Sequence, residues 1–228
     1  MRYENIKRGR FLGRPNRFIA HVELDGEEVI CHVKNTGRCR ELLIPGESTV
    51  YIEDHGPDTN RKTRYSLIGV EKGDLMINMD SQAPNKVVKE WIQAGEFLPG
   101  ITLIKPEKKY GDSRFDFYLE QGDRKIFLEV KGVTLEENGV AMFPDAPTER
   151  GVKHIEELID CKKNGYDAYI VFVVQMAGMK NFTPNDRTQK EFREVLRKAR
   201  ENGVEILVKD CKVTEDELTI TGSLPLEL

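Results

Sequence analysis

The sequence lacks the cysteine and histidine spacings that mark metal or redox sites. Four cysteines and four histidines occur, but there is no Cys-x-x-Cys pair, and the histidines do not complete a zinc-ligand pattern. A structural zinc site is therefore not expected. We expect the cysteines to be reduced and to serve mainly in packing (Cys31, Cys39, Cys161 and Cys211).

Long hydrophobic runs and targeting signals are also missing. The longest run that looks buried, AYIVFVVQMA, is too short to span a bilayer, and the first residues, MRYENIKRGR, lack the apolar core of a signal peptide. Internal repeats and low-complexity segments are absent. The sequence predicts a cytoplasmic globular protein.

The chain has no strong excess of either charge. Its 228 residues are 39% hydrophobic and 32% charged, with a formal net charge of −4, which suits one large domain or two small ones. Charge is nevertheless uneven, since residues 1–22 contain one acid and six basic residues (Arg2, Lys7, Arg8, Arg10, Arg14 and Arg17). Charge alone leaves two readings open, a local basic face or a solvated edge strand.

Residues 1–82 are expected to form a small β-barrel. Short strand-like segments alternate with turns rich in Gly and Pro (residues 17–24, 29–34, 48–54, 65–73 and 75–79). So many strands in so little chain suggest an OB-like barrel, a class that commonly binds nucleic acid strands.

Residues 83–228 are expected to form a mixed α/β sheet, so the chain as a whole is α/β, or α+β. Asn85 is predicted to cap a helix over 85–97, and Thr148 to open one over 148–165. A third strand of the core is expected at GVAMF (139–143), before a further helix over 188–203 and a strand over 204–210. The strand AYIVFVVQ (168–175) is apolar throughout, which indicates burial on both faces.

A predicted hairpin, DSRFDFYLEQGDRKIFLEVKG (112–132), carries charges between its alternating apolar residues. Gly122-Asp123 suits a type II′ turn, and pairing Gln121 with Arg124 places Asp116 opposite Glu129. The same register places Arg114 opposite Lys131.

Directly opposed residues have Cβ atoms about 4.5–5.5 Å apart, so two carboxylates there repel each other. They need a raised pKa or a cation between them, and a divalent metal is the simplest answer. The alternative is a solvated hairpin face with no chemical role.

The order of the hairpin and its flanking elements resembles the PD-(D/E)xK nuclease core. The resemblance implies that Asp116 and Glu129 hold Mg²⁺ or Mn²⁺, and that Lys131 orients the attacking water and offsets charge on the phosphate. It also implies a carboxylate from the preceding helix, for which Glu90 is the candidate against an ordinary exposed acid. The Val130 carbonyl is a further candidate ligand.

The whole chain resembles the sugar fermentation stimulation protein family. The resemblance is carried by HVKNTGR (32–38), YGDSRFDF (110–117), LEVKGVTL (128–135) and FPDAPTERGVKHIEEL (143–158). It implies an N-terminal OB-like domain, a C-terminal nuclease-like domain and DNA binding with little sequence preference.

Further candidate DNA contacts come from four parts of the chain. These are the basic residues 1–22, the hairpin, the Asn-Thr-Gly turn and the helix after Thr148. The turn could bring amides to phosphate or be only a turn, and the helix residues could bind phosphate or only cap and solubilise the helix. The candidates are Arg10, Arg14, Arg17, Asn35, Thr36, Arg38, Arg114, Arg150 and Lys153.

The leading hypothesis is a Mg²⁺-dependent DNA nuclease. Its main rival is a non-catalytic, non-specific DNA-binding regulator of sugar (maltose) metabolism, and a small-ligand or protein-interaction module is a more distant one. Intact Asp116, Glu129 and Lys131 favour the enzyme, and homodimerisation is left open.

Overall fold

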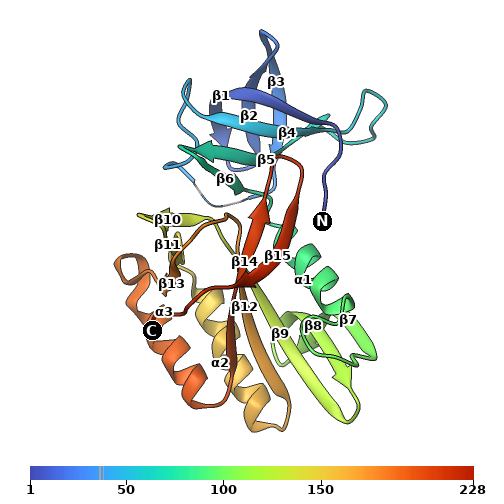
Figure 1. Cartoon of the computed structure of the whole chain (residues 1–228), viewed down its shortest axis with the longest axis vertical. Helices are drawn as coiled ribbons and strands as arrows, with labels where there is room; N and C mark the ends of the chain where they lie inside the picture. Colours follow the sequence, from blue (N-terminus) through green and yellow to red (C-terminus); the bar gives the residue numbers. More distant parts are fainter. Residues whose placement is uncertain (36, 38) are drawn as a thin grey trace. The chain divides into compact units, whose positions relative to one another are not determined.

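The computed structural model describes residues 1–35, 37 and 39–228, which form two compact units (Figure 1). The first unit comprises Met1–Ala83, Gln175–Ala177 and Cys211–Thr219. The second comprises Pro84–Val174, Gly178–Asp210 and Ile220–Leu228. Thr36 and Arg38, two of the predicted DNA contacts, lie outside the described residues.

The first unit is a closed barrel, as predicted. Its strands follow the order β3-β2-β1-β4-β5-β6, and a parallel pairing of β3 with β5 closes the first five into a ring. Phe11, Val22 and Ile52 are buried inside. The strands are β1 (Ile6–Asn16), β2 (Ile19–Leu24), β3 (Glu27–Val33), β4 (Thr49–Asp54), β5 (Tyr65–Lys72) and β6 (Leu75–Asn78).

The basic start of the chain lies largely in β1, which the sequence pattern did not single out as a strand. β1 pairs with β2 on one side and with β4 on the other, so it is not an edge strand. Its charged residues are therefore held on a rigid frame rather than on a free edge.

The second unit contains most of a mixed sheet, also as predicted; the end of β14 and the start of β15 belong to the first unit. The order is β15-β14-β12-β9-β8-β7; β12 runs parallel to β9 and β14, while β7, β8 and β9 are antiparallel. Residues 170–174 of the central β12 are all buried. The strands are β7 (Leu103–Tyr110), β8 (Ser113–Gln121), β9 (Arg124–Val133), β12 (Asp167–Val174), β14 (Glu205–Val213) and β15 (Leu218–Ser223).

The predicted third core strand is wrong. GVAMF does form β11 (Val140–Phe143), but this strand belongs to a separate small sheet with β10 (Leu135–Glu137) and β13 (Asn181–Pro184). The third strand is β7, whose lysines and Pro106 are typical of a sheet edge.

Three helices complete the described part of the second unit: α1 (Ala83–Gln93), α2 (Glu149–Lys163) and α3 (Asp186–Glu201). Thr148 caps α2 as predicted, accepting a hydrogen bond from the Gly151 N–H at 2.9 Å. The predicted cap at Asn85 is wrong, because α1 begins two residues earlier.

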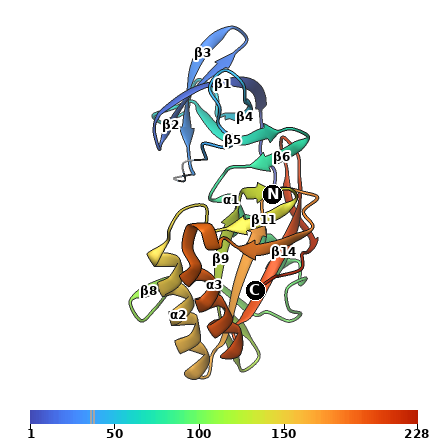
Figure 2. The same cartoon turned by 90° about the vertical axis from the view of Figure 1, so that its left-hand side faces the viewer.

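Helices α2 and α3 lie side by side (Figure 1; Figure 2). In the described residues, no helix is long and apolar enough to cross a membrane.

Candidate functional site

The hairpin of β8 and β9 has the predicted register. Paired positions run from Gln121–Arg124 to Phe117–Leu128, and Gly122 takes the positive φ of +56° that the first turn position requires. Beyond this last pair, the Val130 N–H donates to Asp116 Oδ2 at 2.8 Å. The strands thus bring Asp116 and Glu129 to the end of the paired ladder.

Asp116 is held by two donors. Besides the Val130 N–H, the Asn85 amide from α1 donates to Asp116 Oδ1 at 2.8 Å. Burial, together with the nearby charge of Glu129, nevertheless raises the pKa of Asp116 to about 6. The carboxyl is therefore mostly ionised at neutral pH.

Glu129 is almost fully buried, with only 3% of its surface exposed. Lys131 Nζ lies 2.7 Å and His154 Nδ1 2.6 Å from the same oxygen, Glu129 Oε1. Burial alone would raise the pKa of Glu129, but the His154 hydrogen bond and the Lys131 charge outweigh it, so the pKa is lowered. Glu129 is therefore the member of the pair that ionises at the lower pH.

The other oxygen, Glu129 Oε2, is buried and accepts no hydrogen bond from any residue that the structure describes. A buried carboxylate oxygen without a partner is costly unless a ligand satisfies it. This atom is the strongest sign that the site takes up a further group.

His154 is fixed in one tautomer by its neighbours. Arg150 Nε donates to His154 Nε2 at 3.3 Å, so that nitrogen accepts and Nδ1 carries the proton donated to Glu129. The His154 side chain is buried. Arg150 thus supports the site through His154.

The donor set fits a hard divalent cation. Asp116 and Glu129 supply carboxylate oxygens, and Mg²⁺ characteristically takes one or two carboxylates while it keeps several waters. Within the described ranges, no group of three or more His, Cys, Asp or Glu is placed to hold a metal. A cation bound here would therefore rely on two carboxylates and water.

Glu90 does not share the position of the α1 residue that contacts Asp116. It is exposed and lies five residues after Asn85, about 140° further around the helix. The neighbours Val87, Val88, Trp91 and Ile92 are buried. The helix thus brings an amide, not a carboxylate, to Asp116.

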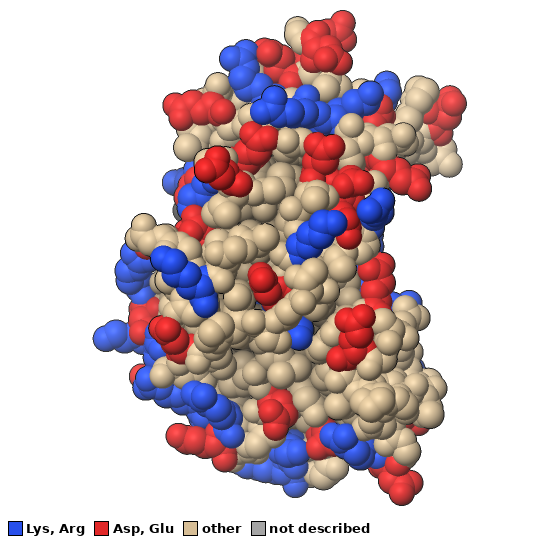
Figure 3. All heavy atoms as spheres, in the orientation of Figure 1, with Lys and Arg blue, Asp and Glu red and all other residues tan. Residues whose placement is uncertain are grey.

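The predicted phosphate contacts are dispersed. Arg114 is exposed on β8 and is paired across the ladder with Lys109, and Lys153 is exposed on α2, 3.8 Å from Glu157. Of the basic start, Arg10 forms an ion pair with Glu23 at 2.7 Å. On the face in Figure 3, acidic and basic side chains are interspersed over each unit.

Arg14 and Asn35 hold the chain around the β1–β2 turn. The Arg14 guanidinium donates to the carbonyls of Asn35 at 2.6 Å, Gly37 at 2.7 Å and Arg17 at 2.7 Å. Asn35 Oδ1 accepts from the Gly37 N–H at 2.8 Å, so its side chain stabilises a turn. Both side chains have structural roles here.

Sequence reasoning missed Asn85 as a partner of Asp116 and His154 as a partner of Glu129. The sequence predicts Asn85 as a helix cap. For the residues on the helix after Thr148, which include His154, it predicts only phosphate contacts or a capping and solubilising role. The segment FPDAPTERGVKHIEEL, which carries part of the family resemblance, contains His154. The sequence did not indicate which acidic residue this histidine contacts.

Comparison with known proteins places both units in one family. Residues 12–79 match the model of the SfsA N-terminal OB domain, and residues 82–217 match that of the sugar fermentation stimulation protein RE domain.

Relatives that match over all or nearly all of their length indicate the same family. A sugar fermentation stimulation protein homolog of Clostridium beijerinckii is 62% identical and aligns over 96% of each chain. That of Ruminiclostridium cellulolyticum is 58% identical over the whole of both chains.

A solved structure, described as Pyrococcus furiosus SfsA in complex with Ca²⁺, has a TM-score of 0.89 and 33% identity. The match covers 100% of this chain and 98% of that one. With both family models and the full-length relatives in agreement, the chain belongs to the sugar fermentation stimulation protein family.

Proposed function

We propose that this protein binds DNA with little sequence preference and that its second unit hydrolyses phosphodiester bonds with a bound Mg²⁺ or Mn²⁺. The observation that carries the proposal is the buried Glu129 Oε2 beside Asp116, which accepts no hydrogen bond from the described residues. The Pyrococcus furiosus relative is described in complex with Ca²⁺, another hard cation that prefers oxygen ligands.

The residues of the site would have two roles, cation binding and the positioning of the two carboxylates. Asp116 and Glu129 would hold the cation, which when bound polarises a phosphate oxygen and lowers the pKa of water. Asn85 and the Val130 N–H fix Asp116, while His154 fixes Glu129.

Lys131 is the group that would meet the substrate. Its ammonium nitrogen lies 2.7 Å from Glu129 Oε1. From there it can orient a water and offset negative charge on the phosphate as the phosphodiester bond breaks. Its side chain is 15% exposed, so it is accessible from the surface.

One observation favours the rival, a DNA-binding regulator without catalysis. Lys131 already forms an ion pair with Glu129 within the fold, and His154 donates a hydrogen bond to the same oxygen, so the Glu129 charge is partly compensated without a metal. The two candidates differ in whether DNA is cut.

A nuclease assay separates them. Purified protein would be incubated with single-stranded, duplex and branched DNA, with Mg²⁺, with Mn²⁺ or with chelator. We expect cation-dependent cutting that falls by orders of magnitude in Glu129→Gln and Asp116→Asn, and about 100-fold or more in Lys131→Ala. Glu156→Gln, an exposed acid on α2, is the control. Wild-type protein that binds DNA but cuts none of these forms would favour the regulator.

A further inference from the structure

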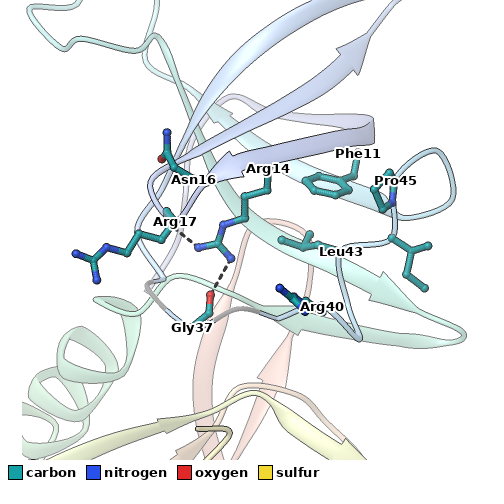
Figure 4. A pocket seen from close by; sticks show the side chains of 9 residues that line it. Phe11, Arg14, Asn16, Arg17, Gly37, Arg40, Leu43 and Pro45 are labelled. Atoms are coloured by element: carbon teal, nitrogen blue, oxygen red, sulfur yellow. Dashed lines mark hydrogen bonds between the residues drawn. The ribbon is translucent and has the colours of Figure 1, made fainter.

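The first unit carries a groove of about 540 Å³ that the catalytic proposal does not use (Figure 4). Phe11, Leu43 and Pro45 form an apolar end, whereas Asn16 and Arg17 lie at the other end, with Arg14 between them. Arg40 also lines the groove. Apolar and cationic surfaces thus face the same space.

The walls of the groove are held in place. The Gly46 N–H donates to the Phe11 carbonyl at 2.8 Å, and the Phe11 N–H donates to the Ser48 carbonyl at 2.9 Å. These bonds join residues 39–48 to β1, and the bonds from Arg14 to Arg17 and Asn35 fix the opposite side. The described walls of the groove are therefore fixed by hydrogen bonds.

The cations at the groove are not neutralised within the fold. Arg17 and Arg40 are both exposed, and neither forms an ion pair with a residue in the described ranges. By contrast, Arg10 and Arg64 are each paired with an acid. Arg40 lies at the groove, and the Arg17 guanidinium points outward at its edge, away from Arg14 (Figure 4). Two uncompensated guanidiniums along one surface favour an anionic ligand.

Apolar groups are exposed beside these cations. Phe18 is 47% and Ile44 42% exposed, two of the few large hydrophobic side chains on the described surface. The Arg17 guanidinium lies 4.9 Å from the centroid of the Phe18 ring. An aromatic face next to an arginine provides a stacking surface for a base whose phosphate the arginine can contact.

We infer that the groove binds a single-stranded segment of nucleic acid. Unpaired bases offer flat apolar faces to Phe18 and the apolar end, while phosphates meet Arg17 and Arg40. Duplex DNA keeps its base faces stacked inside the helix, so it can use the arginines but not the apolar surface. The inference rests on the proposed DNA binding and assigns the form of nucleic acid that the first unit selects.

Fluorescence anisotropy tests this. The full chain, in chelator to prevent cleavage, would be titrated into a labelled oligothymidine of about 16 nucleotides and into a duplex of equal length. We expect the wild type to bind the single strand more tightly, and Phe18→Ser and Arg40→Gln each to weaken that binding about tenfold.

Matched controls separate the groove from general effects. Ile30 is 50% exposed on β3, and Arg200 is exposed on α3, so Ile30→Ser and Arg200→Gln remove similar groups elsewhere. Both should bind like the wild type. Tighter binding of duplex, or groove variants that match the controls, would overturn the inference alone. A wild type that binds neither form would instead overturn the proposed DNA binding on which the inference rests.

Discussion

At the scale of single residues, His154 connects the second unit's helix α2 to its acidic pair. Its Nδ1 donates to Glu129 Oε1, which leaves Oε2 free to face a cation. Asparagine places an amide nitrogen near the position of Nδ1, whereas the glutamine amide reaches toward the position of Nε2.

We therefore expect His154→Asn to keep divalent-cation affinity and His154→Gln to lower it about 10- to 100-fold. Calorimetry with Mn²⁺ measures the affinity, and the melting temperatures of both variants show whether either has merely lost stability. Equal Mn²⁺ affinity in wild type and both variants would remove His154 from the site.

Asp116 predicts a pH dependence of stability in the metal-free protein. Burial raises its pKa from an ordinary 3.8 to about 6, so the folded state holds a proton that the unfolded state releases. The stabilisation that this proton gives the folded state is fully present below about pH 4 and is lost as pH rises through about 6. The free energy of unfolding therefore falls by about 1–3 kcal/mol over this range.

In Asp116→Asn the side chain cannot ionise, so the free energy of unfolding should not fall in this way as pH rises. Denaturant unfolding from pH 4 to pH 8 in chelator compares the two proteins. Parallel stability curves for wild type and variant would show that Asp116 does not titrate in this range.

Three residues of the candidate site could be predicted from the sequence because they share one hairpin. Asp116, Glu129 and Lys131 follow from strand alternation and a turn whose register is local. Asn85 and His154 come from helices 31 and 25 residues away along the chain from their partners. Local patterns hold no information about which helix face meets which strand, so these contacts needed the structure.

At the scale of elements, β1 depends on a close approach to β2. A Cβ atom on Gly9 would lie 2.5 Å from Val22 Cγ1 and 2.7 Å from the Glu23 carbonyl oxygen, whereas one on Gly13 of the same strand would meet nothing within 4 Å.

Gly9→Ala should therefore destabilise the protein by about 1–3 kcal/mol, while Gly13→Ala should be close to neutral. Thermal unfolding of both variants gives the comparison. Similar melting temperatures would indicate that β1 and β2 can separate without cost.

Elements were predictable where their signal was local. The apolar β12 and the Thr148-capped α2 appear as expected, because burial on two faces and capping are visible in the sequence. The sequence did not predict β7, because Lys105, Lys108 and Lys109 interrupt the alternation of apolar and polar residues that marks a strand. β11 was assigned to the wrong sheet because its parallel partner, β13, lies about 40 residues further along the chain.

At the scale of the whole molecule, the net charge of −4 predicts that any DNA binding depends on local cations. Each phosphate contact on a single strand contributes about 0.7 to the slope of log affinity against log salt. Arg17→Gln combined with Arg40→Gln should therefore flatten this slope by about 1.4. Titrations at several salt concentrations measure it, with Arg200→Gln as control, and an unchanged slope would place the phosphate contacts elsewhere.

We propose above that Asp116 and Glu129 bind a divalent cation. A crystal soaked in Mn²⁺ and measured for anomalous scattering tests it most directly. We expect a peak in contact with Glu129 Oε2 and an oxygen of Asp116, absent from a Glu129→Gln crystal. A fully soaked wild-type crystal without a peak at these two carboxylates would contradict it.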